Sequence, residues 1–478
     1  MIGGINRRCL MLILLMFIAG LFYATVGLPN FEPVRSKTDE DFQKKRILKY
    51  SRPAQRHLSG YSEVVIDLEQ ETDAPYVKFA SVSDTNTTRD LLQHPRIQTW
   101  CQRPNNNLSG TEGVPIDGFK LSSVVVLSTP GHTASSSDTV GCDWQEFIAG
   151  YKDQKLSNYK EVLSIHKNIM INKGGFKVYE PISTSGCKDR ELSPLGIAQN
   201  IKLGEFIRKA YIHDLKTLKT LYRESVSFAN SVQDVASYQS SMAFFHGLLC
   251  EKQFMTVNIH KVHDNLCSRA LGLNCKCQTL SQHSDFTTTF NEKEPLKQNI
   301  GREVESPVDF QKYRKYLQDL SRICIDEEIC AGSNCIDSTI NAALHIFKMA
   351  DHALLNITKS PSFIAKARLY SHPLFITIIP TLFEPKHDFT HYSIKEFTFA
   401  NLLVALGIPV HSVPSPASRI SIEVHKKKGG RKRVFRILVN GRDLTPYVKV
   451  CSEEFSSFCN LQTLQNLKIY NYGLACEK

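Results

Sequence analysis

Short apolar runs and longer amphipathic stretches alternate along the chain beyond residue 116. The run Phe119–Leu127 is rich in β-branched residues and ends at a Ser-Thr-Pro-Gly turn, which predicts a strand buried on both faces. A second strand is expected at Asp388–Ser393. Alternation of apolar and polar residues in Ile420–Val424 and Val434–Val439 predicts a hairpin, and Asn440-Gly441 marks a following turn.

Helical patterns separate these strands. Ser193-Pro194 is a typical helix start, with an N-cap serine and a first-turn proline, and apolar residues at helical spacing follow it to Tyr211. Further helices are expected at about Val232–Leu249 and at Phe397–Leu406, the latter closed by Gly407. Strands that alternate with helices indicate an α/β layer fold.

The N-terminal region has a different character. After the short tail of residues 1–8, which ends in Arg7 and Arg8, the chain is uncharged from residue 9 to residue 28. A run of this length is long enough to cross a membrane, and the arginines before it orient the remainder away from the cytoplasm. We therefore expect a single-pass type II membrane protein. The alternative is a cleaved signal peptide, because Ala24 and Gly27 are small residues near the end of the run.

The remainder divides by composition. Residues 29–115 are polar and rich in turn formers, as is typical of a lumenal stem. Residues 116–478 carry the periodic elements and form the expected globular domain. Within it, the cysteine-rich residues 250–359 are expected to form an inserted helical cap.

Cysteine usage supports translocation. The chain has 14 cysteines, and two clusters, Cys267–Cys277 and Cys324–Cys335, have spacings that could bind zinc in a cytosolic protein. Behind a targeting segment, disulfides are the better interpretation, so no metal and no cofactor are expected. The number of cysteines beyond the apolar run is odd, and Cys250, which follows an apolar helix, is the candidate for an unpaired, buried thiol.

Sequons and charge fit a lumenal protein as well. Asn86, Asn107 and Asn356 each begin an Asn-X-Ser/Thr acceptor sequence for glycosylation. The formal net charge of +11 favours anionic glycans as partners, since nucleic acid is not expected in that compartment. Much of the excess lies in His425–Arg433, at the tip of the predicted hairpin, which we interpret either as a solvated turn or as a polysaccharide site.

Several motifs occur in an order that resembles the histidine acid phosphatases. They are Phe119–Val126, Glu191–Gln199, Leu203–Tyr211, Leu402–Gly407 and Ile437–Leu444. The resemblance covers about residues 116–478 and implies a histidine-phosphatase-like mixed sheet flanked by helices. Within the family, the chain is similar to the Golgi phosphatases that act on phosphoxylose in the proteoglycan linkage region.

The residues that perform the family's chemistry are substituted. The resemblance implies an Arg-His-Gly-X-Arg loop after the first strand, whose histidine attacks phosphorus while arginines hold the anionic group. Here Thr129 and Thr133 replace the two arginines, and Pro130 replaces the histidine. Ala236 stands in place of a further arginine, and Lys395-Glu396 stands in place of the His-Asp pair that protonates the leaving group.

Two histidines could carry relocated chemistry. His132 lies two positions after the expected nucleophile, and His387-Asp388 is an apparent His-Asp pair. The pair precedes its strand, however, and is expected at the opposite end of the sheet. Lys395 could hold a phosphate or sulfate as a point charge.

Three functions follow as expectations. The first is a catalytically inactive phosphatase-like protein of the Golgi membrane that binds proteoglycan glycans or Golgi glycosyltransferases and regulates linkage-region biosynthesis. The second is an active phosphomonoesterase that removes the 2-phosphate of linkage xylose. The third is a receptor or adhesion-like protein at the cell surface.

Overall fold

The computed structural model divides the chain into two compact units, residues 1–75 and 76–478. The structure describes residues 95–101, 108–134, 144–149, 153–172, 191–213, 227–232, 235–257, 259–262, 344, 351, 354–355, 358–359, 361–451 and 458–467, all in the second unit. The expected anchor, the three acceptor asparagines and most of the expected cap lie outside these ranges. Within them, no helix has both the length and the apolar character needed to cross a bilayer.

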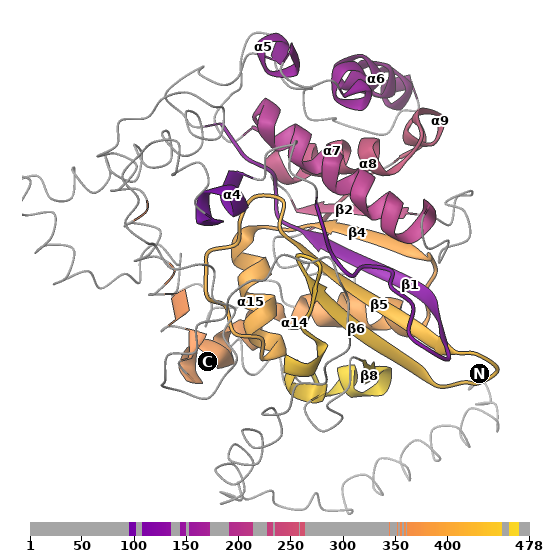
Figure 1. Ribbon diagram of the computed structural model, residues 1–478, viewed down its shortest axis with the longest axis vertical. Helices are drawn as coiled ribbons and strands as arrows, with labels where there is room; N and C mark the ends of the chain where they lie inside the picture. Colours follow the sequence, from indigo (N-terminus) through magenta and orange to yellow (C-terminus); the bar gives the residue numbers. More distant parts are fainter. Residues whose placement is uncertain are drawn as a thin grey trace, which may run out of the picture. The chain divides into compact units, whose positions relative to one another are not determined.

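A mixed sheet forms the centre of the described domain (Figure 1). Its strand order is β3-β2-β4-β1-β5-β6-β7, and β8 pairs with β6. The strands are β1 (Phe119–Ser128), β2 (Ser227–Val232), β3 (Ile259–Val262), β4 (Phe389–Ser393), β5 (Arg419–Lys427), β6 (Arg433–Val439), β7 (Arg442–Asp443) and β8 (Cys459–Asn460). Strands β1 to β4 are mutually parallel, whereas the strands from β5 onward pair antiparallel.

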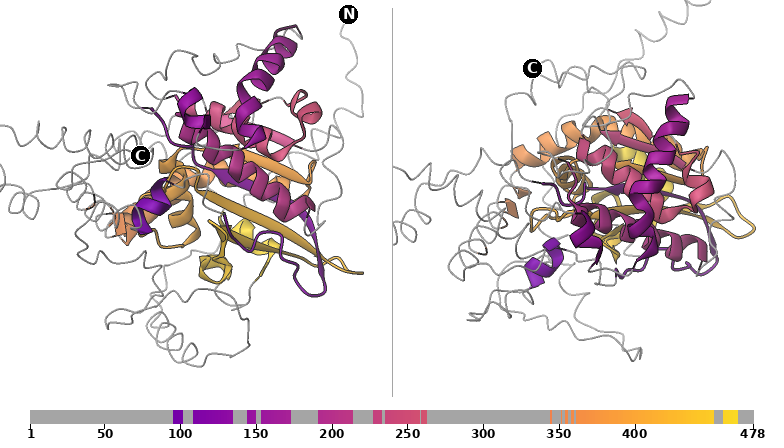
Figure 2. Two further views of the ribbon diagram at one scale, coloured as in Figure 1. Left: turned by 45° about the horizontal axis from the view of Figure 1, so that its top comes forward. Right: turned by 90° about the horizontal axis from the view of Figure 1, so that it is seen from above.

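Helices cover both faces of the sheet, as Figure 1 and Figure 2 show. One face packs against α7 (Pro194–Arg208) and α8 (Val235–Leu248), with α5 (Trp144–Ala149), α6 (Gln154–Asn172) and α9 (Glu251–Phe254) outside them. The other packs against α14 (Pro361–Phe383) and α15 (Glu396–Leu406). A π-helical segment (Lys209–His213) continues α7, and 3₁₀ turns occur at Thr445–Tyr447, Lys449–Cys451 and Leu461–Leu467. The expected mixed sheet flanked by helices is therefore confirmed.

Several elements match the sequence patterns closely. Strand β1 has the expected bounds to within one residue, and both of its faces are buried from Ser123 onward. Ser193 is the N-cap of α7, and its side chain accepts a hydrogen bond from the Gly196 amide. Gly407 closes α15 with φ of 83°, in the left-handed region where glycine has no steric penalty.

Other elements differ from expectation. The helix expected from Val232 begins at Val235, because Val232 is the last residue of β2. Strands β2 and β3, and helices α6 and α14, were not predicted. Helix α14 contains Pro373 and Pro380, residues that ordinarily interrupt a helix.

The globular domain also begins before residue 116. Ile97 and Cys101, on helix α4 (Pro95–Cys101), are almost fully buried, and Glu112 forms a buried ion pair with Arg419. These residues, assigned to the stem from sequence, pack on the domain. At the start of the segment assigned to the cap, β3 (Ile259–Val262) likewise lies in the sheet.

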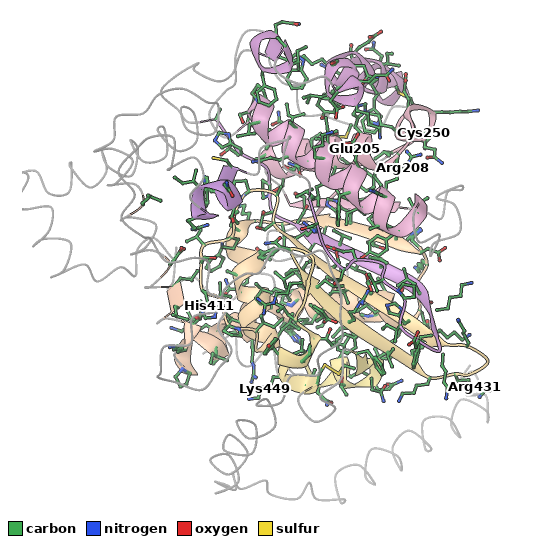
Figure 3. The ribbon with its side chains drawn as sticks, viewed as in Figure 1. Glu205, Arg208, Cys250, His411, Arg431 and Lys449 are labelled. Carbon is green, nitrogen blue, oxygen red and sulfur yellow. A yellow bond between two sulfur atoms is a disulfide. The ribbon has the colours of Figure 1, made fainter. Side chains whose placement is uncertain are left out.

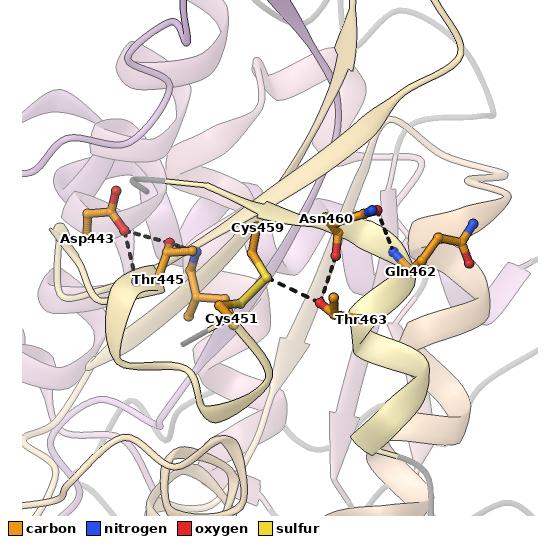
Figure 4. The surroundings of a disulfide bond; sticks show 8 residues. Asp443, Thr445, Cys451, Cys459, Asn460, Gln462 and Thr463 are labelled. Atoms are coloured by element: carbon orange, nitrogen blue, oxygen red, sulfur yellow. Dashed lines mark hydrogen bonds between the residues drawn. A yellow bond between two sulfur atoms is a disulfide. The ribbon is translucent and has the colours of Figure 1, made fainter. Parts of the chain in front are cut away.

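The cysteines that the structure describes fit an oxidising compartment. A disulfide joins Cys451 to Cys459 and ties β8 to the 3₁₀ turn before it, with Thr463 beside the sulfur of Cys459 (Figure 4). Cys101 is also disulfide-bonded. Cys250 carries a free thiol, as expected, although it is half-buried rather than fully buried.

Helices α7 and α8 cross at van der Waals distance because glycines face one another. A Cβ atom added at Gly204 would lie 2.1 Å from the Phe244 carbonyl oxygen, and one added at Gly247 would lie 2.1 Å from that of Ile201. We expect Gly204→Ala to force the helices apart and to lower the free energy of unfolding by about 1–3 kcal/mol, measured by urea denaturation. Gly430→Ala, where an added Cβ has no neighbour closer than 3.5 Å, is the control, and an equal loss there would contradict the explanation.

Strand β4 buries His391, whose ring stacks on that of Phe244 with 4.1 Å between ring centroids. Burial lowers the pKa of His391 to about 3. As the pH falls below about 6.5, the unfolded chain takes up a proton that folded His391 cannot, so folding loses stability progressively toward pH 3. Between pH 6.5 and 4.5, wild type should therefore lose roughly 2 kcal/mol more than His391→Gln, measured by urea denaturation at both values. Equal losses would refute this.

Candidate functional site

The carboxyl edge of the parallel strands gathers the positions that the family resemblance singles out. Strands β1 and β4 pair in parallel with Ser128 opposite Ser393, and the Ile394 amide donates to the Ser128 carbonyl oxygen at 2.8 Å. The loop 129–134 therefore starts beside the segment that leads into α15. Ala236, in the first turn of α8, follows β2, which pairs with the other side of β4.

The loop 129–134 is closed rather than open to solvent. Thr129 and His132 are 0% and 4% exposed, and Pro130 and Gly131 are buried as well. The Gly131 amide donates to Ser240 Oγ at 3.1 Å, and the His132 amide donates to Gln199 Oε1 at 2.9 Å. Pro130 has no amide hydrogen to donate, and the amides of Gly131 and His132 are directed at protein acceptors rather than at a space that an anion could fill.

The outer parts of the loop are held in the same way. The Thr129 amide donates to the Ser418 carbonyl. The Thr129 hydroxyl donates to the Ser415 carbonyl and accepts from the Ser418 amide. At the other end, the Ala134 amide donates to the Glu191 carbonyl, and Thr133 bridges to Leu192. The two threonines at the family's arginine positions thus anchor the loop to neighbouring backbone.

His132 points at the start of α7. Its Nδ1 lies 2.5 Å from Ser193 Oγ, and the Ser193 amide donates to the His132 carbonyl oxygen at 3.0 Å. A Cβ atom added at Gly196 would lie 2.0 Å from the same carbonyl oxygen, so only glycine permits this approach. His132 therefore forms part of the N-terminal cap of the helix.

Helix α4 lies against this edge (Figure 1). Gln199 connects it to the loop: its Oε1 accepts from His132, and its Nε2 donates to the Cys101 carbonyl oxygen at 2.6 Å. At the other end of α4, Arg96 Nη1 lies 3.4 Å from Ser415 Oγ, and the carbonyl of Ser415 accepts from Thr129. The helix is thus linked to the loop at two points.

Arg96 lies close to a site in which the arginines of the family are replaced, but the donors of the Arg96 guanidinium are occupied. Its Nε and Nη2 form a bidentate ion pair with Asp351, at 3.0 and 3.1 Å. Nη2 also approaches the Val413 carbonyl, and the guanidinium lies over the ring of Trp100. Such a paired guanidinium is not available to a phosphoryl group.

The sequence predicted neither the position of Arg96 nor the hydrogen bond between His132 and Ser193, because both depend on residues distant in sequence.

The other positions that the family resemblance singles out lie at both ends of the sheet. Lys395 is the N-cap of α15, Glu396 begins the helix, and both are half-buried. Ala236 is buried and has no polar group in its side chain. His387-Asp388 immediately precedes β4, at the opposite edge of the sheet, as its place in the sequence predicts.

Beneath the loop, His391 and Ser128 form a buried polar pair in the sheet. His391 Nε2 lies 2.9 Å from Ser128 Oγ in a fully buried position. Because its pKa is depressed to about 3, the ring is neutral over the physiological range. Among the residues that the structure describes, no group of three His, Cys, Asp or Glu side chains is placed to hold a metal ion.

The arrangement offers no histidine at the nucleophile position, and Arg96, the arginine that approaches it, is engaged by Asp351. Its donors satisfy acceptors of the chain itself. These hydrogen bonds fix the loop between α7, α8 and α4. These features distinguish it from a site preorganised for an anionic transition state, in which donors point toward the developing charge.

Comparison with known proteins identifies distant relatives. No family model matches the sequence. Mouse 2-phosphoxylose phosphatase 1 is 20% identical over 292 residues, which cover 56% of this chain and 58% of the relative. Mouse lysophosphatidic acid phosphatase type 6 is 21% identical over 311 residues, covering 60% and 71%. The match thus spans less than two thirds of the length of the first relative.

Solved structures of low identity are also similar. The phytase from D. castellii is 16% identical with a TM-score of 0.43, covering 81% of this chain and 88% of the phytase. The apo phytase from Hafnia alvei is 13% identical with a TM-score of 0.43, covering 76% and 99%. These sequence relatives, at low identity, support the resemblance to the histidine acid phosphatases that the motifs indicate.

Proposed function

We propose that the protein is a catalytically inactive histidine acid phosphatase-like protein of the Golgi lumen. It acts by binding, as a regulator of proteoglycan linkage-region biosynthesis, with glycans or glycosyltransferases as partners. The likeness to 2-phosphoxylose phosphatase supports the pathway. The expected N-terminal anchor, with the domain on the lumenal side, supports the compartment.

The observation that carries the proposal is the closure of the loop 129–134. In a phosphohistidine enzyme, the nucleophile must reach phosphorus, and donors must surround the phosphoryl oxygens. Here proline holds the nucleophile position, and the amides of Gly131 and His132 are bound to side chains of α8 and α7. Loss of a nucleophile alone costs on the order of a millionfold in rate for a catalytic unit of this kind.

The second candidate, an active phosphomonoesterase, depends on His132. It is favoured by the short contact between His132 Nδ1 and Ser193 Oγ, since a histidine beside a hydroxyl is a familiar pair in nucleophilic catalysis. Against it, both side chains are at least 95% buried, and Ser193 already caps α7. We therefore interpret the contact between His132 and Ser193 as part of the N-terminal cap of α7 rather than as a catalytic pair.

Phosphatase assays decide between the two. The full chain is assayed on an aryl phosphate and on a phosphoxylosyl linkage oligosaccharide, alongside an active member of the family. We expect turnover below detection for the full chain, because the nucleophile and the arginines are absent. The matched variant is His132→Asn, whose amide can still bond to Ser193 but cannot form a phosphohistidine. Turnover in the wild-type chain that disappears in a folded His132→Asn sample would establish the phosphomonoesterase instead.

A further inference from the structure

The far end of the β5–β6 hairpin concentrates exposed positive charge. Figure 3 shows Arg431 there, away from the carboxyl edge of the sheet. We call this surface the basic hairpin end, and it consists of Lys120, Lys426, Lys427, Lys428, Arg431 and Lys432, all of which are exposed. It lies at the amino end of β1, opposite the closed site, since Phe119 and Lys120 pair with Lys427 and Lys426.

The charges are arranged by the register of the sheet. Lys120, Lys426 and Arg433 stand side by side across β1, β5 and β6. Neighbouring strands are about 4.8 Å apart, so these like charges form a row on one face. Like charges directly opposite one another destabilise a sheet. The row therefore destabilises the sheet relative to a row of neutral polar side chains.

Among the residues that the structure describes, two carboxylates adjoin this surface. Asp117 is near, because the Lys428 amide donates to the Gly118 carbonyl, and Glu384 follows Phe383, whose carbonyl accepts from Arg433. None of the six side chains forms an ion pair with a carboxylate within the described ranges. Protection of an exposed sheet edge does not explain the lysines of β1 and β5 either, since both strands are interior to the sheet.

The shape and composition of the surface restrict its ligand. A projecting turn does not enclose a small anion, whereas an extended polyanion gains from many weak contacts at once. Nucleic acid is not expected in the lumenal compartment predicted for this domain. Anionic lipids are concentrated in the cytoplasmic leaflet, on the other side of the membrane from the expected position of this domain.

We propose that the basic hairpin end binds a sulfated polysaccharide chain. This surface deepens the proposed binding function and rests on it for the choice of a glycan. It also separates the binding surface from the family's catalytic edge, because the two lie at opposite ends of β1.

The test measures binding of heparin to the full chain over a series of salt concentrations. We expect binding whose logarithm falls linearly with the logarithm of salt concentration, since lysines and arginines on a polyanion release counterions. Lys428→Gln with Arg431→Gln should weaken binding on the order of tenfold and reduce the salt slope by roughly two. The matched control is Lys252→Gln with Arg442→Gln, which removes one exposed lysine and one exposed arginine elsewhere and should leave both quantities unchanged.

Absence of heparin binding at low salt, or equal weakening by the two double variants, would overturn the proposal. So would equal affinity for fully desulfated heparin, or a preference for vesicles that contain phosphatidylserine over heparin. All four exchanged residues are exposed, and unchanged thermal midpoints would verify that the variants fold. The outcome is independent of the phosphatase assay: turnover would remove the proposed inactivity without affecting heparin binding, and loss of heparin binding would leave the inactivity standing.

Discussion

Two hydrogen bonds hold the loop after β1 in place, one from the Gly131 amide to Ser240 and one from the His132 amide to Gln199. A buried amide needs a hydrogen-bond acceptor, so an amide that is bonded to the protein is not available to bind an anion. In this chain the partners are side chains of α8 and α7, and both bonds are buried. They turn a segment that could cradle an anion into a rigid junction between the sheet and two helices.

Other features of the scaffold do not depend on the chemistry of this edge. Parallel pairing of β1 with β4 still delivers two loops to one edge, and the glycines of α7 and α8 still allow close helix contact. These features serve folding whether or not the edge is catalytic. Helix α4 adds to the closure, since Cys101 accepts from Gln199, and Arg96 is fixed by Asp351. The paired arginine illustrates that an arginine near a site is useful only if its donors are available.

Local signals predicted most of what lies within single elements. The bounds of β1, the cap at Ser193 and the closing Gly407 were all readable, because each depends on residues adjacent in sequence. Helix α14 was not, because burial against the sheet outweighs the cost of its two prolines. The substitutions at the family's positions were visible in the sequence. The closure was not, because the partners of the loop come from residues about 70 and 110 positions later.

Hydrogen–deuterium exchange of the loop 129–134 in the full chain, with and without phosphate or tungstate, tests the central claim most directly. We predict slow exchange of the Gly131 and His132 amides, because both are buried and bonded to side chains, and no change when the oxyanion is added. Rapid exchange that becomes protected on addition of phosphate or tungstate would contradict the account. It would mean that the loop opens and retains the anion-binding capacity of its family.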